Sequence, residues 1–154
     1  SKQVIAFYLT IYLIMTFAAF FILAIIHRNT GSDDISAFEG LGRRHPLLAI
    51  MTAIIIGALA GLPLTAGFWG KFLAFKTAID AELWVPVSLG FIGVAAGFYY
   101  YFQIIRAMYW RSSLDSETIK IRPIAFRSIA GLTTLVIILG FWPQPIYWLL
   151  QNIS

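Results

Sequence analysis

Four long apolar stretches divide the chain, and the polar residues gather in the gaps between them. The stretches cover about residues 3–26, 46–79, 83–105 and 125–150. A membrane-spanning helix needs about 20 apolar residues to cross roughly 30 Å of hydrocarbon. The first, third and fourth stretches each have this length and predict one transmembrane helix. Together with the second stretch they predict an all-α membrane domain of four transmembrane helices within residues 1–154.

The second stretch, 46–79, is too long for one straight helix, because its 34 residues would reach roughly 51 Å. It also contains Gly61, Pro63, Gly67 and Gly70, which weaken or break a helix. About 15 residues of helix before the break would reach roughly 22 Å, so an unwound part at 61–67 would lie near the membrane midplane. Length alone leaves two interpretations open, one crossing with an unwound middle or two short spans joined as a hairpin.

The positive residues favour the single crossing. The loops 27–45 and 106–127 carry Arg and Lys residues, whereas the short turn at 80–82 carries none. With one crossing both basic loops lie on the same side of the membrane, which is the cytoplasmic or matrix side by the positive-inside rule. With two crossings the loops would face opposite sides. We therefore expect one crossing, with both chain ends and the acidic turn on the other side.

Composition narrows the class of protein further. Hydrophobic residues make up 60% of the chain and charged residues only 12%, against about 25% charged in a soluble domain. The mean hydropathy is +0.82. The absence of cysteine excludes disulfides and cysteine-bound iron–sulfur clusters within this chain. The net charge is +4, and most of the basic residues lie between the apolar stretches. We therefore interpret these residues as a topology signal and expect no nucleic-acid partner. Because the chain opens with Ser1 and enters an apolar stretch at once, we expect a piece of a longer protein.

Lys71, which follows the expected break, is the main candidate for chemistry. Non-helical backbone at membrane depth persists only where protein buries it or where it lines a wet cavity, and broken helices recur in ion-coupled transporters. A lysine at that depth costs about 2.5–3.5 kcal/mol on insertion scales, so such a residue is functional by default. We expect the amine of Lys71 to exchange protons as a relay. The competing explanation is a kinked helix from which Lys71 snorkels to the far interface.

Two further side chains are candidates for lining a proton pathway. Thr65, within the break, could bond freed backbone groups or line the pathway, and both roles stay open. At least one of the tyrosines at 99–101 must face the bundle, where its hydroxyl could join a chain of water molecules. We assign this role to Tyr100 and expect the other two to pack. Lys76, near the acidic residue Asp80, is expected among lipid headgroups.

The segment LAGLPLTAGFWGKF, residues 59–72, resembles the broken-helix motif of the antiporter-like subunits of respiratory complex I, the NADH-quinone oxidoreductase. The greatest similarity is to the subunit N branch of that family. It rests on Lys71, the three consecutive tyrosines and the segment GFWPQP at 140–145. The two prolines of GFWPQP should also interrupt the last helix. Gln103 departs from the pattern, which has a basic residue at this position.

The resemblance implies a proton-translocating membrane subunit, a non-redox part of a translocase, built as an antiporter-like inverted-repeat bundle. This chain would supply the last four spans, and Lys71 would be the relay lysine of the second broken helix, near the outlet of a half-channel. The other relay residues would lie in earlier spans, and we expect Lys71 and the unwound backbone to depend on those spans for partners.

The resemblance also implies the cellular setting. The partners would be neighbouring antiporter-like subunits, the lipid bilayer and protons. No cofactor is expected in this chain, and flavin, iron–sulfur clusters and quinone would belong to partner subunits. The location would be a bacterial inner membrane, or the mitochondrial inner membrane for an organellar protein. Two other functions stay open: a subunit of a multi-subunit cation/proton antiporter or membrane-bound hydrogenase, and a membrane scaffold that transports nothing.

Overall fold

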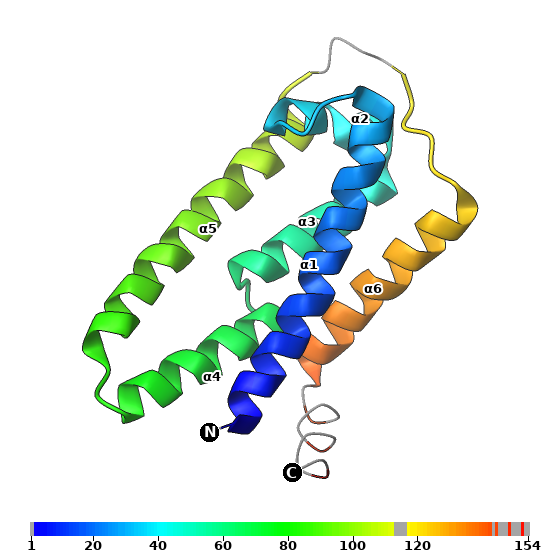
Figure 1. Ribbon diagram of the computed structural model, residues 1–154. Coiled ribbons are helices and arrows are strands. Elements are labelled where there is room, and N and C mark those ends of the chain that lie inside the picture. The colour runs from blue at the N-terminus through cyan, green and yellow to red at the C-terminus, as the bar shows by residue number, and fades with distance from the viewer. Residues whose placement is uncertain (1, 113–116, 143, 145–147, 149–151, 153–154) are drawn as a thin grey trace.

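Helices account for all the regular structure in the described part of the chain, which contains no strand (Figure 1). The computed structural model describes residues 2–112, 117–142, 144, 148 and 152. The all-helical membrane fold expected from the sequence is confirmed. In chain order the elements are α1 (Lys2–Thr30), η1 (Ile35–Phe38), α2 (Leu41–Arg44), α3 (Pro46–Ala60), α4 (Ala66–Asp80), α5 (Trp84–Trp110) and α6 (Pro123–Phe141).

Three helices are long and apolar enough to cross a membrane, namely Ile5–Thr30 within α1, α5 and α6. The helices α3 and α4 have 15 residues each, which is too short for a crossing by either one. They follow one another from one end of the bundle to the other, and both pack against α1 (Figure 1). Together they cross the bundle once, so the arrangement is that of two half-helices in series rather than a hairpin (Figure 1).

The two basic loops lie at the same end of the bundle (Figure 1). There the N–H of Gly40 donates to the carbonyl oxygen of Ala107 at 3.1 Å, and Arg111 pairs with Glu39 at 3.4 Å. The turn between α4 and α5 lies at the opposite end of the bundle, the end at which α1 begins (Figure 1). This distribution is the one that a single crossing by α3 and α4 requires.

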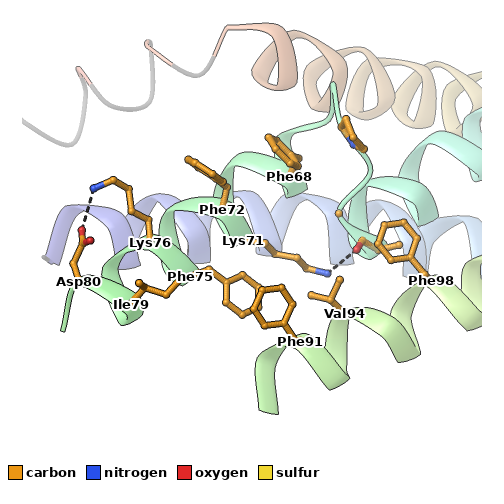
Figure 2. A pocket seen from close by; sticks show the side chains of 13 residues that line it. Phe68, Lys71, Phe72, Phe75, Lys76, Ile79, Asp80, Phe91, Val94 and Phe98 are labelled. Atoms are coloured by element: carbon orange, nitrogen blue, oxygen red, sulfur yellow. Dashed lines mark hydrogen bonds and ion pairs between the residues drawn. The ribbon is translucent and has the colours of Figure 1, made fainter. Parts of the chain in front are cut away.

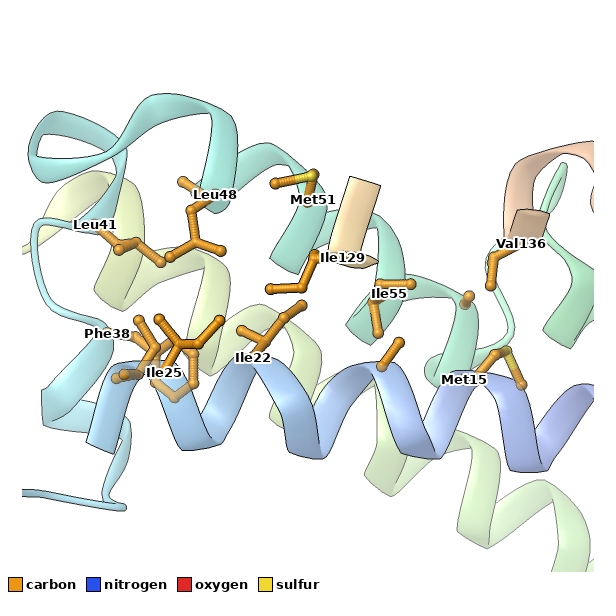
Figure 3. Close-up of a cluster of buried hydrophobic side chains, with 14 of the residues drawn as sticks. Met15, Ile22, Ile25, Phe38, Leu41, Leu48, Met51, Ile55, Ile129 and Val136 are labelled. Carbon is orange, nitrogen blue, oxygen red and sulfur yellow. The ribbon is translucent and has the colours of Figure 1, made fainter. Parts of the chain in front are cut away.

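The core follows one stripe of α1, which packs against α3, α4 and α6 (Figure 3). Its buried side chains recur at intervals of three or four residues, as expected for one face of a helix. Ile55 of α3 and both Ile129 and Val136 of α6 are buried in the same cluster. The opposite face of α1 is exposed at Leu13 and Phe17. The members of the stripe are Phe7, Ile11, Met15, Ala18, Ile22 and Ile25.

The buried side chains of α5 lie near the two ends of the helix. Val87 is buried near its start and Ala107 and Met108 near its end. Between residues 88 and 106, all of which the structure describes, no side chain is buried. A helix that is apolar all round belongs in lipid or among other helices. The middle of α5 therefore offers a long apolar surface to lipid or to further spans.

Candidate functional site at the helix break

The helix α3 ends because Gly61 turns the chain out of the helical path. Its φ of +95° lies in the left-handed region, which side-chain-bearing residues rarely adopt. The N–H groups of Gly61 and Leu62 both donate to the carbonyl oxygen of Gly57 at 2.9 Å. Pro63 then has no N–H with which to continue the helix. The last turn of α3 is thus closed by the chain itself.

The helix resumes at Ala66, so the unwound part is shorter than the expected 61–67. Gly67 and Gly70 lie inside α4, where both permit close approach instead of breaking the helix. A Cβ atom on Gly67 would overlap the carbonyl oxygen of Ala58 on α3. A Cβ atom on Gly70 would lie 2.9 Å from the ring of Tyr8 on α1. These glycines hold the two half-helices and α1 close together.

The helix α6 packs directly on the unwound segment. Leu64 has a φ of +71°, which is uncommon for a residue with a side chain and persists only where surrounding structure holds it. A Cβ atom on Gly140 would overlap the carbonyl oxygen of Leu64, so the two backbones touch. The indole N–H of Trp69 donates to the carbonyl oxygen of Gly140 at 2.6 Å. The end of α6 therefore fixes the geometry of the break.

Lys71 reaches back across the break to the end of α3 (Figure 2). Its Nζ donates to the carbonyl oxygen of Leu59 at 2.7 Å and to that of Ala60 at 3.0 Å. These carbonyls belong to the last turn of α3, where a helix has no partners of its own for its C=O groups. The same helix end carries the negative pole of the helix dipole, which stabilises a cation. A Cβ atom on Gly61 would lie 3.0 Å from Cδ of Lys71, so the glycine also leaves room for the lysine stem.

The hydrogen bonds of Lys71 bear on two expectations, its need for outside partners and the alternative that it snorkels. The expectation that Lys71 needs partners from outside these spans is wrong for two of its hydrogen bonds, because α3 supplies both acceptors. The alternative of snorkelling to the far interface does not fit, because the amine points to the break while Lys76 points the other way (Figure 2). An ammonium group has three N–H donors, and two of them are used within the described part of the chain. The third is available to water or to a further partner.

Two cavities meet at Lys71. The first is a groove of about 590 Å³ between α4 and α5, which runs from the break to the ion pair of Lys76 and Asp80 (Figure 2). The second, of about 420 Å³, is lined by residues of α4 and α5 together with Tyr8 of α1. Phe75 lines both cavities and stacks on Phe91 with ring centroids 4.7 Å apart. Lys71 therefore borders both spaces, whose walls are otherwise mostly aromatic and aliphatic.

The other candidate residues lie apart from Lys71. Thr65 is 8% exposed, and its hydroxyl donates to the carbonyl oxygen of Leu62 at 2.6 Å. Of its two open roles, this contact favours the bonding of freed backbone. Tyr100 is 60% exposed and lines neither cavity at Lys71, so its place in a pathway stays a prediction. Tyr101 instead packs on α3, since a Cβ atom on Gly57 would lie 3.3 Å from its ring.

Sequence reasoning missed two residues of this site. Trp69 was treated as part of a motif, and its hydrogen bond to α6 had no signal in the sequence. Tyr8 lies more than sixty positions before Lys71, and only the packing of α1 on α4 brings it near. Among the residues that the structure describes, no group of His, Asp and Glu side chains could hold a metal ion.

Comparison with known proteins identifies the family of this chain. Residues 1–97 match the family model described as "NADH:quinone oxidoreductase/Mrp antiporter, TM". The chain belongs to this family. It is 36% identical over 141 residues to NADH-quinone oxidoreductase subunit N 1 of Roseiflexus castenholzii, a match that covers 92% of this chain and 26% of that protein. It is 37% identical over 156 residues to subunit N of Protochlamydia amoebophila, covering 100% of this chain and 32% of that protein.

Two solved structures have the same fold. One is respiratory complex I from Thermus thermophilus with bound aureothin, with a TM-score of 0.80 and 31% identity, covering 94% of this chain and 33% of that one. The other is the archaeal membrane-bound sulfane sulfur reductase, with a TM-score of 0.87 and 28% identity, covering 99% of this chain and 31% of that one. The expected resemblance to antiporter-like subunits is confirmed. The chain spans about a third or less of the length of these relatives.

Proposed function

We propose that this chain is the lysine-bearing, broken-helix part of a proton-translocating subunit of NADH-quinone oxidoreductase, of the subunit N kind. Lys71 is the relay residue in this proposal. The observation that carries it is the position of Lys71, a residue of α4 that lines two cavities and whose amine bonds to the end of the other half-helix, α3. The names of the relatives from Roseiflexus castenholzii and Protochlamydia amoebophila support the assignment to that complex.

The hydrogen bonds of Lys71 suit a group that changes protonation without disturbing the fold. A charged amine has three N–H donors. Two of them bond the carbonyl oxygens of Leu59 and Ala60, and the third can donate to water in a cavity. A neutral amine has two N–H donors and one lone pair. It can keep both carbonyl bonds and turn the lone pair to the same water, so the proton leaves and returns while the break keeps its shape.

The rest of the proposal follows the family. The subunit carries no redox centre itself, and flavin, iron–sulfur clusters and quinone belong to partner subunits of the complex. The chain lies in the bacterial inner membrane, or the mitochondrial one for an organellar protein. The end of the bundle with loops 27–45 and 106–127 faces the cytoplasm or matrix, because these loops carry most of its Arg and Lys residues. Neighbouring antiporter-like subunits are the protein partners.

The decisive experiment replaces Lys71 in the full-length subunit within its assembled complex. Lys71→Met removes the amine, and Lys71→Arg keeps a charge that is not lost in the useful pH range. Each variant locks one protonation state, so both should pump fewer protons per NADH oxidised. Reconstituted vesicles supplied with NADH and quinone report pumping and electron transfer together.

Lys76→Met is the matched control for this experiment. Lys76 lies five residues further along α4 and lines the same groove, but its side chain is 62% exposed and pairs with Asp80 at 3.0 Å. Its replacement should leave pumping nearly unchanged. Unchanged pumping by Lys71→Met in a normally assembled complex would reject the relay and leave the scaffold without transport as the better account.

A second candidate function is favoured by one observation. The structural similarity to the archaeal membrane-bound sulfane sulfur reductase has a TM-score of 0.87, against 0.80 for respiratory complex I. The same broken helix could therefore serve a different respiratory complex, a membrane-bound hydrogenase or a multi-subunit cation/proton antiporter. Purification of the full-length protein with its native partners separates these functions. Flavin and iron–sulfur subunits that oxidise NADH indicate complex I. Redox subunits that do not oxidise NADH indicate a hydrogenase or another respiratory complex, and the absence of any redox subunit indicates the antiporter.

A further inference from the structure

A basic groove lies at the opposite end of the bundle from the turn between α4 and α5. It has a volume of about 630 Å³ and lies between the end of α1 and the start of α6. Three cations line it, Arg28 of α1 and Lys120 and Arg122 of the segment that leads into α6. Its remaining lining is mostly apolar and consists of Phe21, Ala24, Ile25, Ile121 and Ala125, with Asn29 as the one neutral polar residue.

Asn29 brings these cations together from distant parts of the sequence. Its side-chain Nδ2 donates to the carbonyl oxygen of Lys120 at 3.0 Å, and its Oδ1 accepts from the N–H of Lys120 at 2.8 Å. The same Nδ2 also donates to the carbonyl oxygen of Ile25 within α1 at 2.9 Å. Residues 91 positions apart are thereby held side by side. The groove is a fixed feature of the packing of the leading segment on α1.

The charge of the groove is not balanced within the described part of the chain. Neither Arg28, Lys120 nor Arg122 has a side-chain hydrogen bond or ion pair among the described residues, whereas Arg111 at the same end pairs with Glu39. The positive-inside rule accounts for the number of cations at this end. The rule does not explain why three cations line the same groove without an acidic partner.

The charged and apolar parts of the groove lie at the depths of a lipid headgroup and of its acyl chains. The cations lie at the ends of two membrane helices, where headgroups are found, and Phe21 lies roughly 10 Å further along α1 toward the hydrocarbon. We propose that this groove binds one anionic phospholipid, with its phosphate between Arg28, Lys120 and Arg122 and an acyl chain along Phe21 and Ala24. Basic pockets between membrane helices on this side are suited to anionic headgroups. A soluble anion without an acyl chain would make no contact with the apolar residues that line the groove.

The test is crosslinking in the full-length protein. A phosphatidylglycerol with a photoreactive acyl chain should label the α1 peptide that contains Phe21 and Ala24, and phosphatidylcholine with the same chain should label it far less. Neutralising the cations, as in Arg28→Gln, should weaken half-saturation about fivefold for each charge removed, which equals ~1 kcal/mol per cation. Equal labelling by both lipids, or no effect of the triple Gln variant, would overturn the proposal.

Two controls keep the result specific. Arg127 lies on α6 at the same end and is exposed, but it does not line this groove, so Arg127→Gln should leave labelling unchanged. An equal loss in Arg127→Gln would mean diffuse attraction to the membrane surface instead of a site. Ala24→Trp keeps every charge and fills the apolar part of the groove, so it should abolish labelling. It tests the site even if the triple variant fails to fold. Glycerol phosphate should not compete, and competition by it would indicate a soluble anion site.

Discussion

Replacing Gly67 by alanine tests the close approach of the two half-helices. The added Cβ atom would overlap the carbonyl oxygen of Ala58, lie 2.8 Å from the carbonyl carbon and 3.1 Å from Sδ of Met15. The obstructing atoms of Ala58 are backbone, which cannot turn aside as a flexible side chain can. The start of α4 must therefore move away from the end of α3, and Lys71 moves with it.

The cost of Gly67→Ala has two parts. Over-packing in a well-packed interior costs about 1–3 kcal/mol, and backbone contact places this case at the upper end. The displacement also strains the bonds from Lys71 to Leu59 and Ala60, and a hydrogen bond to a charged group is worth about 1.5–3 kcal/mol. We expect a total loss of at least about 3 kcal/mol, which is more than a hundredfold in the folding equilibrium.

Gly131→Ala is the matched control. Gly131 lies on α6, and an added Cβ atom would meet nothing within 4 Å. Alanine is favoured over glycine within a helix by about 0.5–1 kcal/mol, so this variant should be neutral or slightly stabilised. Detergent-induced unfolding of the full-length protein, followed by tryptophan fluorescence, measures both variants. Equal unfolding midpoints for Gly67→Ala and Gly131→Ala would contradict the close approach of α3 and α4.

Substitutions at Gly61 and Thr65, each with a control variant, separate conformation from chemistry at the break. Gly61→Ala should cost about 1–2 kcal/mol for its left-handed φ and should also lower proton pumping, because the new methyl meets Cδ of Lys71 at 3.0 Å. Gly31→Ala carries the same conformational cost at a φ of +72° but meets nothing within 4 Å, so it should destabilise the protein without changing pumping per folded complex. Thr65→Val should cost about 1 kcal/mol of unfolding free energy because the bond to Leu62 is lost, and Thr65→Ser should restore it. Pumping that falls further than stability in Thr65→Val, without rescue by serine, would point to a pathway role for the hydroxyl.

The sequence allowed the helices and the break to be predicted because these features are local. Apolar length located α1, α3 with α4, α5 and α6, and a positive φ at Gly61 together with Pro63 ended α3 as expected. The ends of helices were less accurate. The helices α1 and α5 run to Thr30 and Trp110, several residues past the predicted ends, because polar and aromatic residues at the membrane surface continue a helix without an apolar signal. The prediction that Pro143 and Pro145 interrupt the last helix lies outside the described residues.

The direction of the Lys71 side chain could not be predicted, because it depends on tertiary geometry. A lysine in the second turn of α4 can extend along α4 or back over the break, and its position in the sequence does not distinguish these. The choice depends on where Gly67 lets α4 approach Ala58, and that approach brings the last carbonyls of α3 within reach. The roles of Gly67 and Gly70 were misjudged for the same reason, since a glycine that allows contact and one that breaks a helix look alike in a sequence.

The position of Lys71 also limits how its protonation could be driven. Its fixed acceptors belong to α3, and the dipole at that helix end favours the charged amine by at most about 2 kcal/mol. A unit positive charge that arrives about 6 Å away opposes this with roughly 2.8 kcal/mol at an effective dielectric constant near 20. One such charge therefore outweighs the helix end and changes the protonation ratio about a hundredfold. The apolar walls formed by Phe75 and its neighbours screen little, so a charge on a neighbouring span could act through the cavities without touching the lysine.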